Sequence, residues 1–291
     1  MLRDKTRRLI PMLVLASCAW TQLSAQEPSS CTFHKVQIQT HDTFVYGINN
    51  SGAIVGTYNP TSGSQAAHIL KNGTVTTIFY PRAAMTDGFG INDYGAIVGA
   101  YVPPGIGTPD YGFEWKNGTF VNITFPGALS TEAFGINIHG VVVGSYQDSS
   151  GVFHGFRYSG GKYTRLDYPH AQSTVVSSIN NNGVISGAYT DSSNVDHGFT
   201  AQNGTFTSID YPGAANTSLG QVNNNGIVSG TYYDSAFTTW TGFLFENGRF
   251  KKISDPAAST ETAVNGINDS NIVVGNADYS GAGFRADGCV P

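Results

Sequence analysis

The chain has 291 residues, of which 40% are hydrophobic and only 12% are charged. This length allows one large core or two small ones, and the repeats described below decide between these options. The formal net charge of −5 argues against nucleic acid as a partner, because phosphate binding needs an excess of Lys and Arg.

Residues 1–25 have the features of a secretory signal peptide. Four basic residues precede an apolar run over residues 9–19 that is too short to span a bilayer. We predict cleavage after Ala25, with residues 26–31 as a linker. The alternative is a lipoprotein signal that ends before Cys18 and anchors the protein in the outer membrane. No later apolar stretch is long enough for a transmembrane helix, so we expect a secreted or periplasmic monomer.

The rest of the chain consists of six copies of one repeat. The copies begin with GINNSGAIVGTY at Gly47 and recur at offsets of 43 to 45 residues, starting at Gly90, Gly135, Ser178, Gln221 and Gly266. Each copy contains two β-runs around an Asn/Gly turn, a polar loop, a Gly-Phe strand, a second turn and a fourth strand. Four strands in 40 to 45 residues are typical of a β-propeller blade. We therefore predict an all-β, six-bladed propeller of antiparallel blades.

The sixth copy ends after its third strand, predicted at residues 283–286. Thr32–Val36 match the fourth strand Thr205–Ile209 in the spacing of their aromatic and aliphatic residues, so we expect the N-terminus to complete blade six. Cys31 and Cys289 then fall where a tight turn joins the third and fourth strands of other blades. We predict that a disulfide replaces this turn, and that the propeller spans residues 32–291.

The GINNSGAIVGTY string, the HGF strand at His154 and the Asp-Tyr-Pro-Gly-Ala link at Asp210 together resemble the bacterial extracellular repeat proteins of the HAF family. The resemblance covers residues 32–288. It implies an exported β-propeller, and it implies no activity, cofactor or catalytic residue set.

Recurring polar residues have two interpretations. The repeated asparagines either form six equivalent ligand sites or hold the first hairpin turn; they are Asn49, Asn92, Asn137, Asn180, Asn223 and Asn268. The tyrosines that end the second strand either stack on sugars or pack between blades; they are Tyr58, Tyr101, Tyr146, Tyr189 and Tyr232. We favour the structural role for both sets.

Motifs for metal or nucleophilic chemistry are missing from the sequence. His154 and His197 occupy equivalent positions in different blades, so they are not expected to share a metal ion. We expect no cofactor; the alternative is calcium at the polar loops that begin at Asp148 and Asp191. No GxSxG elbow and no phosphate-binding loop occurs.

Charged residues that depart from the repeat cluster in the links between blades. In a propeller these links share one face with the loops between second and third strands, and they could converge on the central mouth. Asp87 and Glu132 occupy equivalent positions in adjacent blades, and His170 precedes the fourth blade; these three would form the catalytic set of an enzyme. The candidate ligand-binding residues of the same face are Arg82, His41, Asp42, Glu261 and Trp240.

These features favour a secreted, non-catalytic binding propeller for carbohydrate or another cell-surface polymer. One alternative is a glycan-active hydrolase or lyase with its site at the central mouth. The other alternative is a structural or protein-interaction module, for which the repetition alone is a sufficient explanation.

Overall fold

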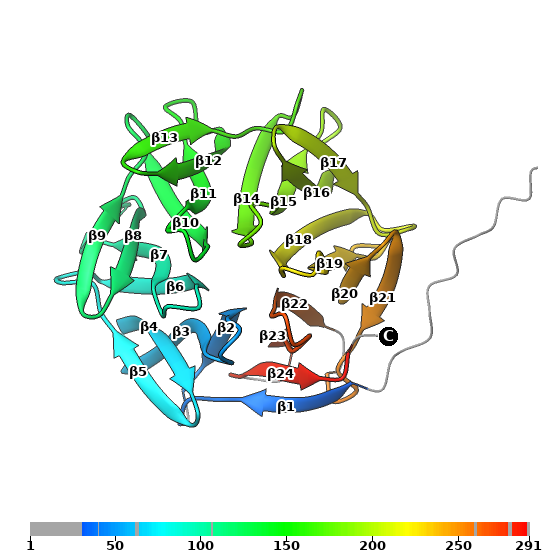
Figure 1. Ribbon diagram of the computed structural model, residues 1–291, viewed down its shortest axis with the longest axis horizontal. Helices are drawn as coiled ribbons and strands as arrows, with labels where there is room; N and C mark the ends of the chain where they lie inside the picture. The colour runs from blue at the N-terminus through cyan, green and yellow to red at the C-terminus, as the bar shows by residue number, and fades with distance from the viewer. Residues whose placement is uncertain are drawn as a thin grey trace, which may run out of the picture.

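The computed structural model describes residues 31–39, 41–61, 64–105, 107–258, 261–278 and 281–289. These residues form a ring of six four-stranded antiparallel blades around a central axis (Figure 1). Within them no helix is long and apolar enough to cross a membrane. The predicted leader lies outside the described residues. The all-β class and the six-blade count agree with the prediction.

The strands follow one another outward from the axis in each blade. Blade one contains β2 (Thr43–Ile48), β3 (Ile54–Thr61), β4 (Ser64–Lys71) and β5 (Thr74–Ile78). Blade two contains β6 (Met85–Ile91), β7 (Ile97–Val102), β8 (Tyr111–Lys116) and β9 (Thr119–Ile123). Blade three contains β10 (Ser130–Ile136), β11 (Val142–Gln147), β12 (Phe153–Ser159) and β13 (Lys162–Arg165).

The second half of the ring repeats this order. Blade four contains β14 (Ser173–Ile179), β15 (Ile185–Thr190), β16 (Asp196–Gln202) and β17 (Thr205–Ile209). Blade five contains β18 (Asn216–Val222), β19 (Val228–Tyr233), β20 (Trp240–Glu246) and β21 (Arg249–Ile253). Blade six contains β22 (Thr262–Ile267), β23 (Val273–Ala277), β24 (Gly283–Asp287) and the N-terminal β1 (Thr32–Val36).

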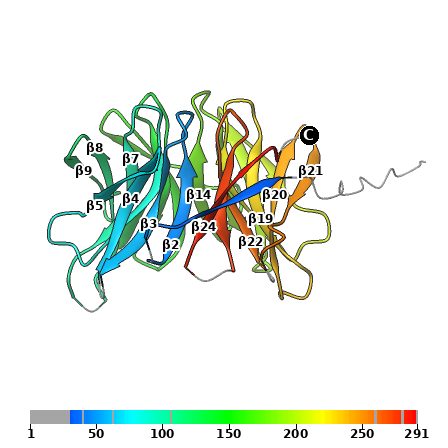
Figure 2. The same ribbon diagram turned by 90° about the horizontal axis from the view of Figure 1, so that it is seen from below.

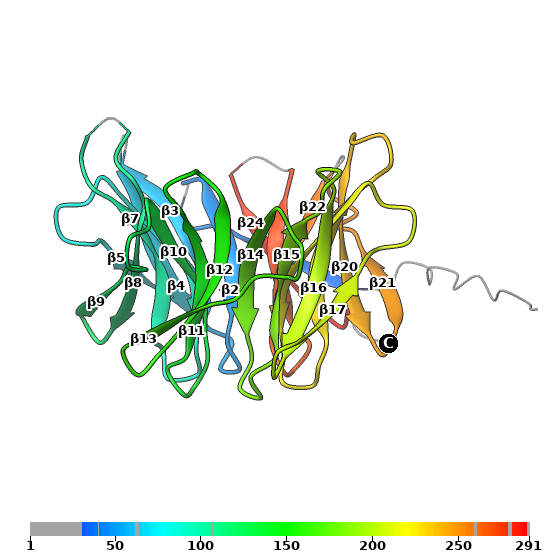
Figure 3. The ribbon, with the colours of Figure 1, turned by 90° about the horizontal axis from the view of Figure 1, so that it is seen from above.

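The two faces of the ring, seen from the side in Figures 2 and 3, carry different kinds of connection between strands. In four blades the third and fourth strands are joined by an Asn-Gly turn such as Asn72-Gly73, whose φ angles of 50° and 76° are those of a type I′ hairpin, and in blade three Gly160-Gly161 takes this place. Because strands alternate in direction, both tight turns of a blade lie on one face. The opposite face, called the link face below, carries the links between blades and the loops between second and third strands.

The repeated asparagines hold the ring together near the axis. Asn49 Oδ1 accepts hydrogen bonds from the backbone N–H groups of Ser51 and Ala53 in its own turn. Its Nδ2 donates to the carbonyl of the equivalent asparagine in the next blade, Asn92, at 2.9 Å. Each of the six asparagines donates in this way, and Asn268 donates to Asn49. The predicted turn role is confirmed, and the same side chains also join neighbouring blades.

Each link is fastened to the blade that follows it. A buried Thr at the start of the inner strand accepts a hydrogen bond from the link backbone; for example, Thr86 Oγ1 accepts from Tyr80 N. Four links also stack an aromatic ring on the tyrosine that ends the second strand, with centroids 3.6 to 3.8 Å apart. In blade six both members of this stack are replaced, by Asp255 and Ala277. These contacts favour packing as the role of the repeated tyrosines.

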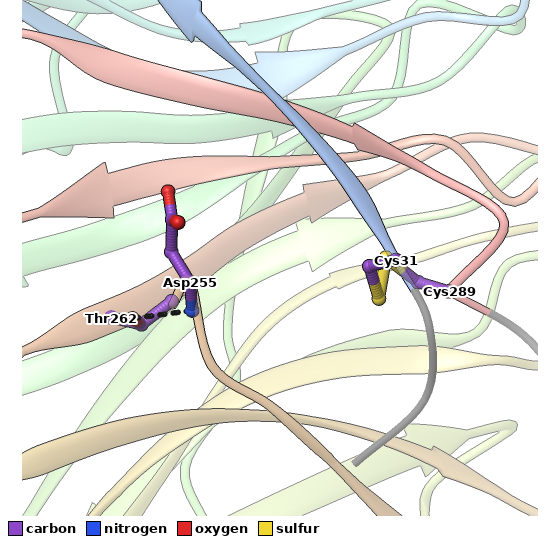
Figure 4. The surroundings of a disulfide bond; sticks show 4 residues. All are labelled: Cys31, Asp255, Thr262 and Cys289. Carbon is purple, nitrogen blue, oxygen red and sulfur yellow. Dashed lines mark hydrogen bonds between the residues drawn. A yellow bond between two sulfur atoms is a disulfide. The ribbon is translucent and has the colours of Figure 1, made fainter. Parts of the chain in front are cut away.

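The N-terminus completes blade six, as expected. β1 pairs antiparallel with β24, with Thr32 opposite Asp287 and Val36 opposite Gly283. Cys31 and Cys289, which are 258 residues apart in the sequence, form the predicted disulfide next to this pair (Figure 4). The same figure shows the hydrogen bond that fastens the link of this blade to its inner strand, in which Asp255 N donates to Thr262 Oγ1.

One aromatic side chain from each third strand fills the blade core, with a single exception. Phe113, Phe156, Phe199, Phe243 and Phe284 are all fully buried opposite a second-strand glycine. His68 takes this position in blade one, opposite Gly56, and is also fully buried. Neither nitrogen of its ring has a hydrogen-bond partner.

Candidate functional site

An interruption in every inner strand directs one residue toward the axis. The pairing register of the inner and second strands shifts at the residue before the GIN motif or its equivalent, which is a β-bulge. At Gly90, the position after the bulge in blade two, a Cβ atom would lie 2.5 Å from the carbonyl oxygen of Phe134, whereas blades four and five carry Ser178 and Gln221 at the equivalent position. The six bulged residues all line one cavity on the axis; they are Tyr46, Phe89, Phe134, Ser177, Gly220 and Asn265.

The cavity, about 390 Å³ in volume, has two unlike sides. Blades one to three contribute Tyr46, Phe89 and Phe134, which we call the aromatic wall. Ring centroids of Tyr46 and Phe89 are 5.3 Å apart, and those of Phe89 and Phe134 are 5.0 Å apart. Blades four to six contribute small or polar residues at the same level, so space remains on their side of the axis.

The cavity extends over the link-face ends of blades four and five. Its lining there includes Asp196, Asn216 and Ser218. It also includes Tyr233 and Trp240, whose rings lie 5.3 Å apart at an angle of 23° and which we call the rim platform. Trp240 is 37% exposed, so one part of this ring remains available to a ligand. Of the predicted ligand-binding residues, Trp240 is the one that the structure places in the cavity lining.

Gln221 forms the floor of the cavity. Its side chain reaches from blade five to blade one, where Nε2 donates to the carbonyl of Ile48 at 3.0 Å. Its Oε1 accepts from the backbone N–H of Ile267 in blade six at 3.2 Å. Gln221 also lines a hollow of about 40 Å³ at the tight-turn face, and therefore lies between the two spaces.

Two predicted acidic residues influence each other through their charges. Burial, together with a smaller contribution from the carboxylates of Asp110 and Asp87, raises the pKa of Glu132 to about 7. Burial also raises the pKa of Asp87, although hydrogen bonds from Thr57 and Gln65 oppose this shift. Asp110, which directly precedes β8, was not among the predicted site residues. The three carboxyl groups therefore share one electrostatic environment.

The remaining predicted residues lie at the starts of different blades. Arg82 and His170 are exposed at equivalent turns, with φ angles of 65° and 64°. His41 lies 6.0 Å from the Tyr58 ring before blade one, and Asp42 accepts from Asn59 N there. Glu261 accepts from Asp278 N before blade six. Convergence of these five residues on one ligand stays a prediction.

The repeated histidines each lie between two aspartates. His154 has Asp148 at 3.2 Å and Asp167 at 3.0 Å from its two nitrogens, and His197 is held in the same way in blade four. Asp148 Oδ1 accepts from Ser150 and Val152 of its own loop, so the carboxylate is engaged in holding the turn. Among the described residues, no group of three His, Cys, Asp or Glu is placed to hold a metal ion. Calcium binding at these loops stays a prediction.

The aromatic wall and Gln221 are the site residues for which the prediction had no role. A signal existed, because the residue before the GIN motif changes from aromatic in three copies to Ser, Gly and Asn in the others. Gln221 entered the prediction only as the first residue of the fifth copy. Neither role follows without the bulge that directs these side chains to the axis.

No protein-family model and no curated protein matches the sequence. The solved structures that are similar in fold include the following three. A putative TolB from Agrobacterium tumefaciens has a TM-score of 0.58 at 12% identity, covering 77% of this chain and 88% of its own. AofleA from Arthrobotrys oligospora has a TM-score of 0.56 at 12% identity, with 90% and 88% covered. A catalytically inactive virginiamycin B lyase from Staphylococcus aureus, with quinupristin, has a TM-score of 0.51 at 13% identity, with 88% and 99% covered.

At these identities the likeness concerns the fold alone. It assigns the chain a β-propeller-like fold. The resemblance to the HAF family stays a prediction.

Proposed function

We propose that this protein is an exported propeller that binds carbohydrate, or a unit of another cell-surface polymer, in its axial cavity. The observation that carries the proposal is the contrast between the two sides of the cavity. Three aromatic rings face a wall of hydroxyl and amide groups, which include those of Ser218, Asn216 and Asn265. Sugars present apolar C–H faces and hydroxyl edges, so both sides of the cavity match them.

Cavity size and position support this function. A volume of about 390 Å³ lies within the usual range for small-ligand pockets, roughly 300 to 1,000 Å³. The disulfide fits a protein that matures in an oxidising compartment such as the periplasm or the cell exterior. We propose a monomer that belongs to the HAF repeat proteins, with either of the two predicted signals directing its export.

The test is a glycan-array screen of the chain without residues 1–25, followed by titration of each glycan that binds. Phe89→Ala removes the middle ring of the aromatic wall and is expected to weaken binding at least tenfold, which is about 1.4 kcal/mol. Phe153→Ala is the matched control, because Phe153 is exposed on β12 outside the cavity lining. Equal affinities of the two variants, with melting temperatures unchanged, would place the ligand elsewhere. Absence of any binding would favour the structural or interaction module.

A glycan-active hydrolase or lyase is the second candidate, because Glu132 has a pKa of about 7 beside Asp87. A carboxyl group that stays protonated near neutral pH can act as a general acid, while a neighbouring carboxylate serves as base or nucleophile. His170, the third residue of this hypothesis, lies at an exposed link turn. Each bound glycan is therefore incubated and examined for cleavage. Turnover that is lost in Glu132→Gln and in Asp87→Asn, with binding kept, would favour the enzyme.

A further inference from the structure

The axial cavity is open at one end and closed at the other. At the base of the cavity Gln221 reaches from blade five past blade six to blade one, and both ends of its amide are engaged, with Ile267 and Ile48. Beneath it the six asparagines form their ring of hydrogen bonds between blades. Gln221, Ile91, Ile136 and Ile179 line both the cavity and the hollow on the far face, and this hollow, at about 40 Å³, is too small to hold a sugar unit.

The cavity continues sideways in one direction. Opposite the aromatic wall, its lining runs from Ser218 and Asn216 to the rim platform of Tyr233 and Trp240. On the other side, among the described residues, the cavity lining from blades one to three contains no link-face residue beyond the aromatic wall, so there is no comparable extension. A ligand longer than the cavity therefore leaves it across blade five.

The rim platform is held in place before any ligand arrives. Asp234 accepts hydrogen bonds from the backbone N–H of Thr238 at 2.7 Å and from its hydroxyl at 2.6 Å. The backbone N–H of Phe237 donates to the Asp234 carbonyl at 3.0 Å, which closes the turn. A preorganised aromatic surface loses little conformational entropy on binding. This loop is therefore suited to hold a ligand unit adjacent to the cavity.

We infer that the cavity recognises the end of a linear carbohydrate chain rather than its interior. The terminal unit stacks on the aromatic wall above Gln221, and the next unit lies on the rim platform. This inference rests on the proposed function and adds a direction and a chain end to it. A unit from the interior of a chain would need two exits, one for each flanking segment. The cavity offers one, across blade five, because its floor and the aromatic wall close the other directions.

The first test uses cello-, malto- and chito-oligosaccharides of one to six units in calorimetric titrations. Affinity is expected to rise about tenfold from one unit to two or three and then to stay constant. Longer polymers of the series that binds should compete equally per chain at every length, because each chain has one matching end. Competition that increases in proportion to the number of units per chain would overturn end recognition.

The second test separates the rim platform from the aromatic wall. Trp240→Ala is expected to lower trisaccharide affinity about tenfold and to leave monosaccharide affinity unchanged, whereas Phe89→Ala lowers both. Phe237→Ala is the matched control from the same loop, because Phe237 is 61% exposed and does not line the cavity. Loss of binding in Phe89→Ala without any effect of Trp240→Ala would overturn the inference and leave the cavity site intact. Failure of every oligosaccharide to bind would overturn the inference together with the carbohydrate proposal.

Discussion

Single residues that break the repeat carry the chemistry of this ring, and His68 shows the cost of such a change. It stands in a core position that five other blades fill with Phe, it is fully buried, and its two nitrogens lack partners. Burial lowers its pKa to about 4 from the ordinary 6.5. The folded state therefore holds the neutral ring, while the unfolded chain takes up a proton below pH 6.5.

His68→Phe is expected to stabilise the protein, and to do so more strongly in acid. The folded pKa is lower than the unfolded one, so wild-type stability falls as the pH falls from 6.5 to about 4, by up to about 3 kcal/mol. The variant lacks this loss and should show a flatter pH dependence. Urea unfolding at pH 5 and pH 7 measures it, with His139→Phe at an exposed turn as the control. If the free energy of unfolding changed by the same amount between pH 7 and pH 5 in His68→Phe and in the wild type, this role of His68 would be contradicted.

At the scale of elements, the links between blades reuse one turn with different residues. Arg82 and His170 adopt positive φ angles at the position where Gly127 and Gly213 occur in other links. In all four links a proline precedes this residue, as in a type II turn, whose second central residue favours glycine. A side chain in this left-handed region costs about 1 kcal/mol. Two contacts hold the turn in these links. One is the hydrogen bond from the link backbone to the buried Thr, such as Tyr80 N to Thr86 Oγ1, and the other is the stacked aromatic pair, such as Tyr80 and Tyr101.

Arg82→Gly and His170→Gly should each stabilise the fold by about 0.5 to 1 kcal/mol, because they relieve this strain. Gly127→Ala in the equivalent turn is the reverse control and should destabilise it by a similar amount. Thermal melts of the three variants give the signs directly. Destabilisation by both glycine substitutions would show that the Arg82 and His170 side chains make contacts that outweigh the strain.

Across the whole molecule, the chain ends are joined at blade six. β1 pairs with β24, and the disulfide between Cys31 and Cys289 fastens the two strands beside their shared end. Asn268 and Asn276 also bond to blade one, at Asn49 and Val45. A cross-link over 258 residues removes much freedom from the unfolded chain, and the chain-entropy model gives about 5 kcal/mol as an upper figure.

Cys31→Ser with Cys289→Ser should lower the free energy of unfolding by about 2 to 5 kcal/mol without changing the far-UV spectrum. The same loss should follow reduction of the wild-type protein, and chemical denaturation with and without reductant measures it. Equal stability under the two conditions would mean that β1 and the blade contacts alone hold the ends together.

The repeat allowed the blades, their four strands, the N-terminal strand and the disulfide to be predicted, since each recurs in register or replaces a recurring part. Less of the candidate site could be predicted from the sequence. Asp87 and Glu132 were recognisable as paired departures, but Asp110 joins them from a loop of another kind. The aromatic wall depends on a bulge at Phe89 and its equivalents, and the role of Gln221 depends on a contact with Ile48, two blades further round the ring. Such features follow from pairing geometry and not from residue type.

A structure of the ring with a bound oligosaccharide tests the central proposal most directly. The ligand would be the oligosaccharide of highest affinity in the titrations, soaked into crystals of the chain without residues 1–25. The account predicts the terminal sugar against Phe89 and Phe134, above Gln221, with the next unit on Tyr233 and Trp240. A ligand on the outer strands or at the tight-turn face, with an empty axial cavity, would contradict it.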